Sequence, residues 1–161
     1  MDIIPGSMAD LKAKCLSRLQ RICSKAEYCT ADIRRKALRS LDGDAEAADE
    51  VVAALVADKY VDDRRYASAF AREKASLQGW GTVKIRFQLR GKGISDEVIS
   101  SALEDVDADG AEKKLDKLLA AKARTLEGDP QFRLKMLKYG LSRGYEYPEV
   151  EASLERLKNN S

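Results

Sequence analysis

Apolar residues recur at every third or fourth position along most of this chain, with polar residues between them. In the first third, this spacing predicts an amphipathic helix over residues 10–25, a second helix that Thr30 caps and that runs to about Leu41, and a third that ends near Tyr60. Gly43 marks the break between the second and third helices. The first sixty residues therefore predict three helices and no strand.

The middle of the chain repeats this order. Asp62 and Asp63 are a pair of carboxylates placed to cap and complement the start of a helix, which is a simpler role for adjacent residues than holding a metal ion. That helix stops at the Gly-Trp-Gly turn of residues 79–81. Thr82 is placed to cap a basic helix, and Ser95 to cap an acidic one.

The last third predicts three more helices. Apolar residues at Leu115, Leu118 and Leu119 mark the first of them. Pro130 and Pro148 suit the first positions of the next two, because proline lacks an N–H that the first turn of a helix does not need. No segment alternates with period two for long enough to predict a strand, so we expect an all-α protein of about nine helices.

The helices recur as copies of one unit. Ile33, Ile85 and Leu137 are 52 residues apart, and the apolar residues four positions further on keep that step: Ala37, Leu89 and Leu141. This predicts three tandem three-helix repeats, at residues 9–60, 61–108 and 109–161, that form an elongated, curved array. Residues 1–8 precede them as a disordered leader that resembles a cloning junction before a second start.

Charge alternates along the chain although the net charge is only +2. Residues 64–92 contain eight Lys or Arg against one Asp or Glu, and residues 93–112 contain none against seven. One interpretation is a set of solvated faces in which acidic helices balance neighbouring basic ones. The other is a basic surface that attracts a polyanion, because local field rather than total charge decides such attraction.

Enzyme chemistry finds little support in the composition. The chain has no histidine, no phosphate-binding Walker A loop and no dinucleotide fingerprint, so we expect no catalytic activity and no cofactor or metal. Cys15, Cys23 and Cys29 contain no CxxC pair, and we interpret Cys15 and Cys23 as small core residues. No apolar run approaches the ~18 residues of a membrane helix, and we expect a cytoplasmic protein.

Eleven residues form the predicted binding surface. Ten are cations from the basic stretches, and the eleventh is the tryptophan of the glycine turn: Arg34, Arg35, Arg64, Arg65, Arg72, Lys74, Trp80, Lys84, Arg86, Arg90 and Lys92. The cations could form a groove for phosphate or for an acidic protein. Trp80 could stack on a base or insert into a partner, or it could cover the core of its own unit.

The second unit resembles a known family. The residues that carry the resemblance are Lys59-Tyr60-Val61-Asp62-Asp63-Arg64-Arg65-Tyr66-Ala67, Phe70-Ala71-Arg72, the glycine turn, Lys84-Ile85-Arg86-Phe87-Gln88-Leu89 and Lys92-Gly93-Ile94. This pattern is similar to the RecX family of bacterial RecA regulators, specifically over residues 59–103 and more weakly over 9–58 and 111–158. Two departures are Thr82, where the family turn usually has proline, and Lys59, where it tends to have glycine.

The resemblance implies three tandem three-helix repeats and a non-enzymatic role. It implies binding along the groove of the RecA filament on DNA, with restraint of the ATPase, strand-exchange and coprotease activities of RecA. It also implies direct binding to single-stranded DNA and, as a second form, to double-stranded DNA. We expect a monomer and no membrane partner. The alternatives are a helical DNA-binding module that acts without RecA, and a helical scaffold that binds only proteins.

Overall fold

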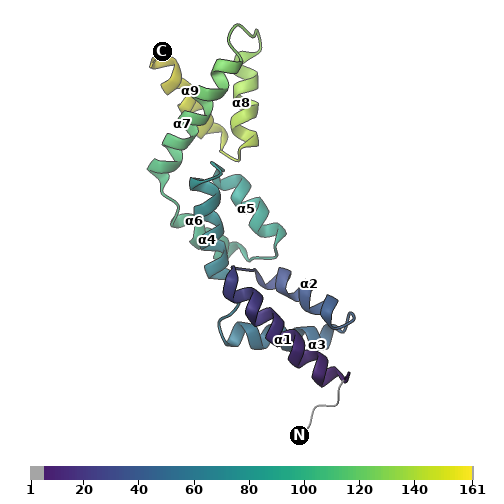
Figure 1. Ribbon diagram of the computed structural model, residues 1–161. Coiled ribbons are helices and arrows are strands. Elements are labelled where there is room, and N and C mark those ends of the chain that lie inside the picture. The colour runs from purple at the N-terminus through teal and green to yellow at the C-terminus, as the bar shows by residue number, and fades with distance from the viewer. Residues whose placement is uncertain (1–5, 161) are drawn as a thin grey trace. The chain divides into compact units, whose positions relative to one another are not determined.

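The computed structural model describes residues 6–160, and this part of the chain is all helical without a strand (Figure 1). It contains nine helices: α1 (Met8–Lys25), α2 (Thr30–Ser40), α3 (Ala45–Ala57), α4 (Asp63–Ser76), α5 (Thr82–Gly91), α6 (Asp96–Glu104), α7 (Ala108–Thr125), α8 (Phe132–Ser142) and α9 (Tyr147–Asn159). The all-α prediction is confirmed. No helix within the described residues is long and apolar enough to cross a bilayer.

Most helix starts lie within two residues of their predicted positions. Thr30 and Thr82 are the first helical residues of α2 and α5 rather than their caps. Pro148 lies in the first turn of α9 as expected, but Pro130 precedes α8, which begins only at Phe132. Residues 1–5 of the expected leader lie outside the described part of the chain.

The sequence suggested a leader that extends to residue 8, but the structure places the start of the first helix at that residue. The Ser7 side chain accepts a hydrogen bond from the backbone N–H of Asp10 at 3.1 Å, and Met8 begins α1. Capping by a serine oxygen satisfies one of the N–H groups that a helix start leaves without a partner. Ser7 and Met8 therefore belong to the first helix.

Close contacts divide the chain into two compact units. Unit 1 comprises the described residues up to Ala67 together with Lys92–Ser95, and unit 2 comprises Ser68–Gly91 together with the described residues from Asp96 onward. In unit 1, α1, α2 and α3 enclose a core that includes Leu19, Ile33 and Leu55. In unit 2, α7, α8 and α9 pack around a second core. Cys15 is buried in the first core and Cys23 packs against it, as predicted.

The repeat changes its step in α8. The buried pair that corresponds to Ile33 and Ala37 is Met136 and Gly140, one position earlier than the predicted Leu137 and Leu141. Leu141 is 44% exposed. A Cβ atom at Gly140 would lie 2.6 Å from Val150 Cγ1. The close approach of α8 and α9 therefore requires a glycine at the position of α8 that faces Val150. This close approach selects the buried face of α8: Leu137 still packs against the core from its edge, whereas the prediction for Leu141 is wrong.

Candidate functional site

The eleven predicted binding residues belong to both units. Five lie in unit 1: Arg34, Arg35, Arg64, Arg65 and Lys92. Six lie in unit 2: Arg72, Lys74, Trp80, Lys84, Arg86 and Arg90. Each set is described within its own unit.

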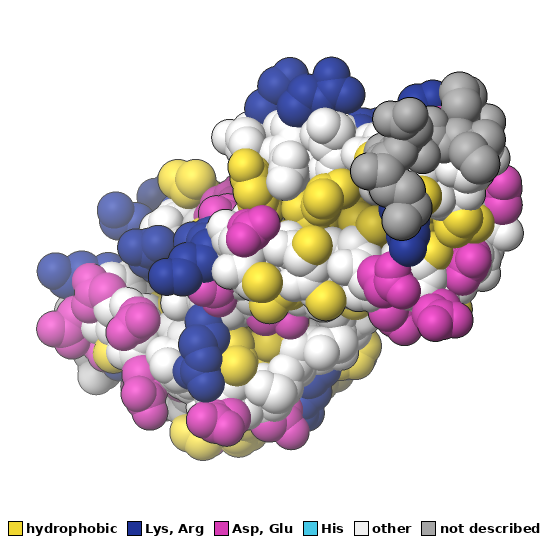
Figure 2. Space-filling model, turned by 90° about the horizontal axis from the view of Figure 1, so that it is seen from below, with side chains coloured by type: hydrophobic (Ala, Val, Ile, Leu, Met, Phe, Trp, Pro, Cys, Tyr) yellow, Lys and Arg dark blue, Asp and Glu magenta, His cyan; other side chains and the backbone are white. Residues whose placement is uncertain are grey.

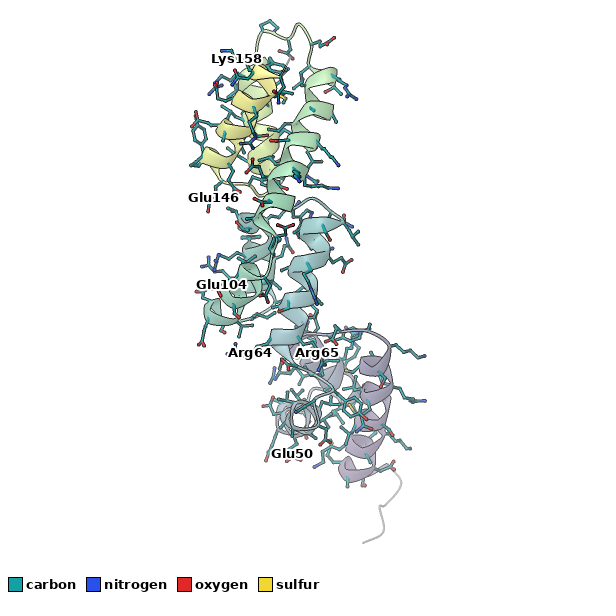
Figure 3. All side chains as sticks on the ribbon, turned by 90° about the vertical axis from the view of Figure 1, so that its left-hand side faces the viewer. Glu50, Arg64, Arg65, Glu104, Glu146 and Lys158 are labelled. Carbon is teal, nitrogen blue, oxygen red and sulfur yellow. The ribbon has the colours of Figure 1, made fainter. Side chains whose placement is uncertain are left out.

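Arg65 connects three parts of unit 1. Its Nε donates to Glu27 Oε1 at 2.7 Å, and its terminal nitrogens donate to the backbone oxygens of Lys59 and Tyr60 at 3.1 and 3.3 Å. Lys59 has a φ of +63°, so the chain reverses sharply at this point. Arg65 therefore holds the end of α3 and the segment after α1; it and its neighbour Arg64, both in the first turn of α4 (Figure 3), are exposed.

Several predicted cations pair with the acidic helix of the same repeat. Arg34 Nε lies 2.8 Å from Asp49 Oδ1, between α2 and α3. Arg90 Nε lies 2.7 Å from Asp96 Oδ1, and an Arg86 nitrogen donates to Ser100 Oγ at 3.3 Å, both between α5 and α6. Figure 2 shows groups of both signs lying beside one another on one face. Internal pairing thus accounts for part of the alternation of charge along the sequence.

Trp80 forms a cluster with two lysines of unit 2. Lys84 Nζ lies 4.4 Å and Lys74 Nζ 5.0 Å from the centre of its ring, and the Phe70 ring meets it edge-on at 6.1 Å. A cation over an indole face is attracted by the ring's quadrupole. Neither lysine has a carboxylate partner within the described residues. The cluster brings together α4, the glycine turn and α5, and half-buries the indole.

A close backbone junction lies beside this cluster, and we call it the C-terminal junction. Gly81 N–H donates to Arg143 O at 2.8 Å, and Val83 N–H donates to Gly144 O at 2.9 Å. These bonds satisfy two donors that the start of α5 would otherwise leave unpaired. A Cβ atom at Gly81 would lie 2.2 Å from Gly144 O, and one at Gly144 would lie 2.3 Å from Lys84 Cβ. Both glycines are therefore required by space.

Tyr145 completes the C-terminal junction. Its hydroxyl donates to Gly79 O at 3.1 Å inside the structure. Burial raises the pKa of Tyr145 to about 12, so the hydroxyl stays protonated and keeps donating. The turn before α9 therefore holds both the glycine turn and the first turn of α5.

A corresponding N-terminal junction lies in unit 1 and uses side chains instead. Asp63 Oδ1 accepts from the Thr30 N–H at 2.8 Å, so Asp63 caps α2 rather than its own helix, which Asp62 caps. Lys92 Nζ lies 3.4 Å from Asp32 Oδ2. Burial alone would raise the pKa of Asp32, but hydrogen bonds and the charge of Lys92 outweigh it and the pKa is lowered. Asp32 therefore stays ionised and holds Lys92.

The two junctions use equivalent turns. Three turns of four residues connect the second and third helix of successive repeats: residues 41–44, 92–95 and 143–146. At their second position stand Asp42, Gly93 and Gly144, all with positive φ. The last two turns form the N-terminal and C-terminal junctions. The sequence analysis missed these contacts, although the spacing of Gly93 and Gly144 after each basic helix could have indicated them.

Two exposed apolar residues on α5 were also missed. Val83 and Phe87 are 49% and 72% exposed, whereas Ile85 and Leu89 are fully buried. The sequence analysis did not distinguish these two pairs. Helical spacing separates them, because residues two apart in a helix lie on different faces. The outward side of α5 is therefore partly apolar.

Unit 2 also contains basic residues that the prediction did not include. Lys122 Nζ lies 5.2 Å from the centre of the Tyr139 ring, and Lys135 Nζ lies 2.6 Å from Asp129 Oδ2. Both lysines and Lys138 line a shallow hollow of about 350 Å³. Within the described residues, no three His, Cys, Asp or Glu side chains are grouped so that they could hold a metal ion.

Comparison with known proteins gives matches over most of the chain. The family described as "RecX, second three-helix domain" matches residues 62–103. Regulatory protein RecX of Haemophilus ducreyi is 31% identical over 77% of this chain and 80% of its own length. Regulatory protein RecX of Prosthecochloris aestuarii is 30% identical over 91% of this chain and 95% of its own length.

Solved structures share the fold. A crystal structure of regulatory protein RecX superposes with a TM-score of 0.83 at 25% identity and covers 92% of this chain and 73% of that chain. RecX from Lactobacillus salivarius superposes with a TM-score of 0.80 at 22% identity, over 93% of this chain and 98% of its own. The helical architecture described above is therefore the architecture of these structures.

Proposed function

Since this chain belongs to the RecX family, we propose that it regulates the RecA recombinase by binding the RecA–DNA filament and restraining its ATPase, strand-exchange and coprotease activities. The observation that carries this proposal is the similarity of nearly the whole chain to proteins named as regulatory protein RecX. The role is one of binding and is not enzymatic. A filament on DNA presents both a polyanion and a protein surface, and this chain has basic and apolar features for each.

The basic contribution comes from cations that are not committed to internal carboxylates. Lys74 and Lys84 sit around Trp80 without acidic partners within the described residues, and Arg72 is exposed on α4. These three residues are better placed to meet phosphates than Arg90 and Arg34, whose guanidinium groups pair with Asp96 and Asp49. Counterion release on binding phosphates supplies affinity that falls with salt.

The test is the steady-state ATPase of RecA on single-stranded DNA, titrated with this protein. We expect the rate to fall at less than one molecule of this protein per RecA, because blocking filament growth affects many subunits at once. Replacing Lys74 and Lys84 together by Glu weakens inhibition in this scheme, and the matched charge control replaces Lys113 and Lys117, both on the exposed surface of α7, by Glu.

A helical DNA-binding module that acts without RecA is the second candidate. The lysines around Trp80 favour it, because cations beside an aromatic ring are common where single strands bind. An unchanged ATPase rate, together with tight and steeply salt-dependent binding to bare single-stranded DNA, would replace the proposed function by this one. Inhibition without any affinity for DNA would instead leave a protein-only regulator.

A further inference from the structure

The third repeat contains a basic hollow between α7 and α8, in a part of the chain where the sequence analysis placed no binding residue. Its volume is about 350 Å³, and its lining consists of Lys122, Leu126, Lys135, Lys138, Tyr139 and Ser142. The four lining residues from α8 are spaced three or four positions apart, so they lie on one face of that helix. We call this feature the α8 hollow.

We infer that the α8 hollow binds backbone phosphates of a DNA strand, so that the third repeat contributes to the DNA contact together with the lysines around Trp80. The inference rests on the DNA contact of the proposed function and adds a second phosphate site to it. The contact carries no sequence information, because phosphates are the same beneath every base.

The charge of the lining selects an anion. None of the six lining residues is a carboxylate, and Lys122 and Lys138 have no carboxylate partner within the described residues. Of the three lysines, only Lys135 is paired, with Asp129. Three other hollows of unit 2, of about 650, 420 and 240 Å³, each have at least one Asp or Glu in their lining. The α8 hollow differs from them by the sign of its charge.

Tyr139 positions a cation in the hollow without neutralising it. Lys122 Nζ lies 5.2 Å from the centre of the Tyr139 ring, close to the 5.0 Å between Lys74 Nζ and the Trp80 ring. A ring attracts an ammonium group through its quadrupole but has no net charge, so the positive charge stays available to an anion. Tyr139 itself packs against the core formed by α7, α8 and α9. A cation held in this way loses less conformational freedom when a phosphate binds.

The shifted step of α8 explains why Lys138 is available. Lys138 follows Arg34 and Arg86 by the repeat of 52 residues, and those two arginines contact the third helix of their own repeats, at Asp49 and Ser100. In α8 the buried face lies one position earlier, which turns Lys138 by about 100° relative to its counterparts. Lys138 therefore lines the hollow beside α7 and makes no such contact with the third helix.

The α8 hollow ends beside the C-terminal junction. Ser142 lines the hollow and lies two residues before Gly144, where an added Cβ would be 2.3 Å from Lys84 Cβ. Lys138 precedes Gly144 by six residues, which is about 9 Å along a helix. A few nucleotides span this distance, so one strand can contact the lysines around Trp80 and the α8 hollow together.

The shape of the hollow favours a phosphate backbone over an acidic protein. It is shallow, and apart from its cations it offers one leucine and the edge of a packed tyrosine. Protein interfaces have an apolar core inside a polar rim, and this lining has too little apolar surface for such a core. Phosphates need only cations within reach, and their binding releases counterions.

The experiment measures the affinity of the full chain for single-stranded oligothymidylate over a range of salt concentrations. The test variant replaces Lys122 and Lys138 together by Gln. We expect the slope of log K against log salt to fall by about 1.4, because each phosphate contact on a single strand contributes about 0.7. The control replaces Lys113 and Lys117 by Gln, because both are exposed on α7 outside the hollow, and we expect its slope to be unchanged.

A third variant replaces Lys122 and Lys138 by Arg and separates charge from shape. We expect it to keep the slope of the unaltered protein, and a loss as large as with Gln overturns the inference. Equal slopes for the Gln variant and its control also overturn it. If the Gln variant inhibits the RecA ATPase less while its slope on oligothymidylate is unchanged, the hollow binds an acidic protein surface instead, and the phosphate assignment is wrong.

The inference and the proposed function fail separately. An unaltered protein that inhibits the RecA ATPase but does not bind oligothymidylate would overturn the inference and leave the proposed regulation standing. An unaltered protein without effect on the ATPase, whose slope falls in the Gln variant as expected, would support the phosphate site and remove the proposed regulation.

Discussion

Replacing Gly81 by Ala tests whether the C-terminal junction stabilises unit 2. A methyl group at this position would lie 2.2 Å from the backbone oxygen of Gly144, far inside the contact distance, and backbone cannot swing aside as a flexible side chain can. The turn before α9 must then move away from α5. Both hydrogen bonds, from Gly81 N–H and Val83 N–H, would be lost or stretched.

The size of the effect follows from these two bonds. Each backbone hydrogen bond contributes about 1 kcal/mol to stability, so their loss costs about 2 kcal/mol. Alanine also restricts the unfolded chain and returns about 0.4–1 kcal/mol. We expect Gly81→Ala to lower the free energy of unfolding by about 1–2 kcal/mol, the difference of these terms.

Gly91 provides the control on the same helix. A Cβ atom at Gly91 meets nothing within 4 Å, and its φ is not positive. Gly91→Ala should therefore stabilise the protein by up to about 1 kcal/mol, because only the effects on the unfolded chain and on helix propensity remain. The two glycine-to-alanine changes thus have opposite signs.

The assay is equilibrium unfolding in urea, followed by the fluorescence of Trp80. Trp80 is the only tryptophan of the chain and is adjacent to Gly81, so its emission reports on the junction. A lower urea midpoint for Gly81→Ala with an unchanged slope supports the reasoning. If Gly81→Ala and Gly91→Ala shift the midpoint equally, the close backbone contact does not stabilise this unit and the argument is refuted.

Three further predictions concern single side chains. Asp63→Ala removes the cap on Thr30 and should cost about 1 kcal/mol in thermal or urea unfolding, and an unchanged midpoint would rule out that cap. Burial alone would raise the pKa of Asp116, but hydrogen bonds from Arg156 and Ser153 outweigh it and lower this pKa below 3.8. The contribution of ionised Asp116 to stability is therefore present at neutral pH and is lost as the pH falls below 3.8. Asp116→Asn should reduce the difference in urea midpoint between pH 7 and pH 3, and an identical difference would contradict this. Lys84→Gln should lower the slope of log K against log salt for single-stranded DNA by about 1, and an unaltered slope would exclude a phosphate contact there.

The sequence predicted the number and order of the helices because their apolar spacing and caps are local properties. It failed in α8 because Phe132, Leu134, Met136, Leu137 and Leu141 put apolar groups on nearly every side. The buried side of α8 is decided by a residue without a side chain, since Gly140 is where Val150 packs. Apolar periodicity cannot count glycine as a core residue.

The candidate surface was predicted as a set of cations but not as an arrangement. Basic stretches are visible in the sequence, whereas the partners of Arg34, Arg90 and Arg65 lie 15, 6 and 38 residues away. Which charges remain available depends on how helices pack within each repeat. The apolar exposure of Phe87 was in principle readable from helical spacing, because it lies two residues from each of two core positions.

The turn at residues 41–44 has a consequence for self-association. It has the same length as the two turns that dock onto a neighbouring repeat, but Asp42 stands where Gly93 and Gly144 stand, and Gly43 replaces the buried Ile94 and Tyr145. At Gly144, a single added Cβ would already lie 2.3 Å from the receiving helix. A second copy of this chain would therefore meet, at this turn, neither the glycine that the C-terminal junction requires nor the buried side chain that follows it, so stacking through the turn in the manner of residues 143–146 is disfavoured.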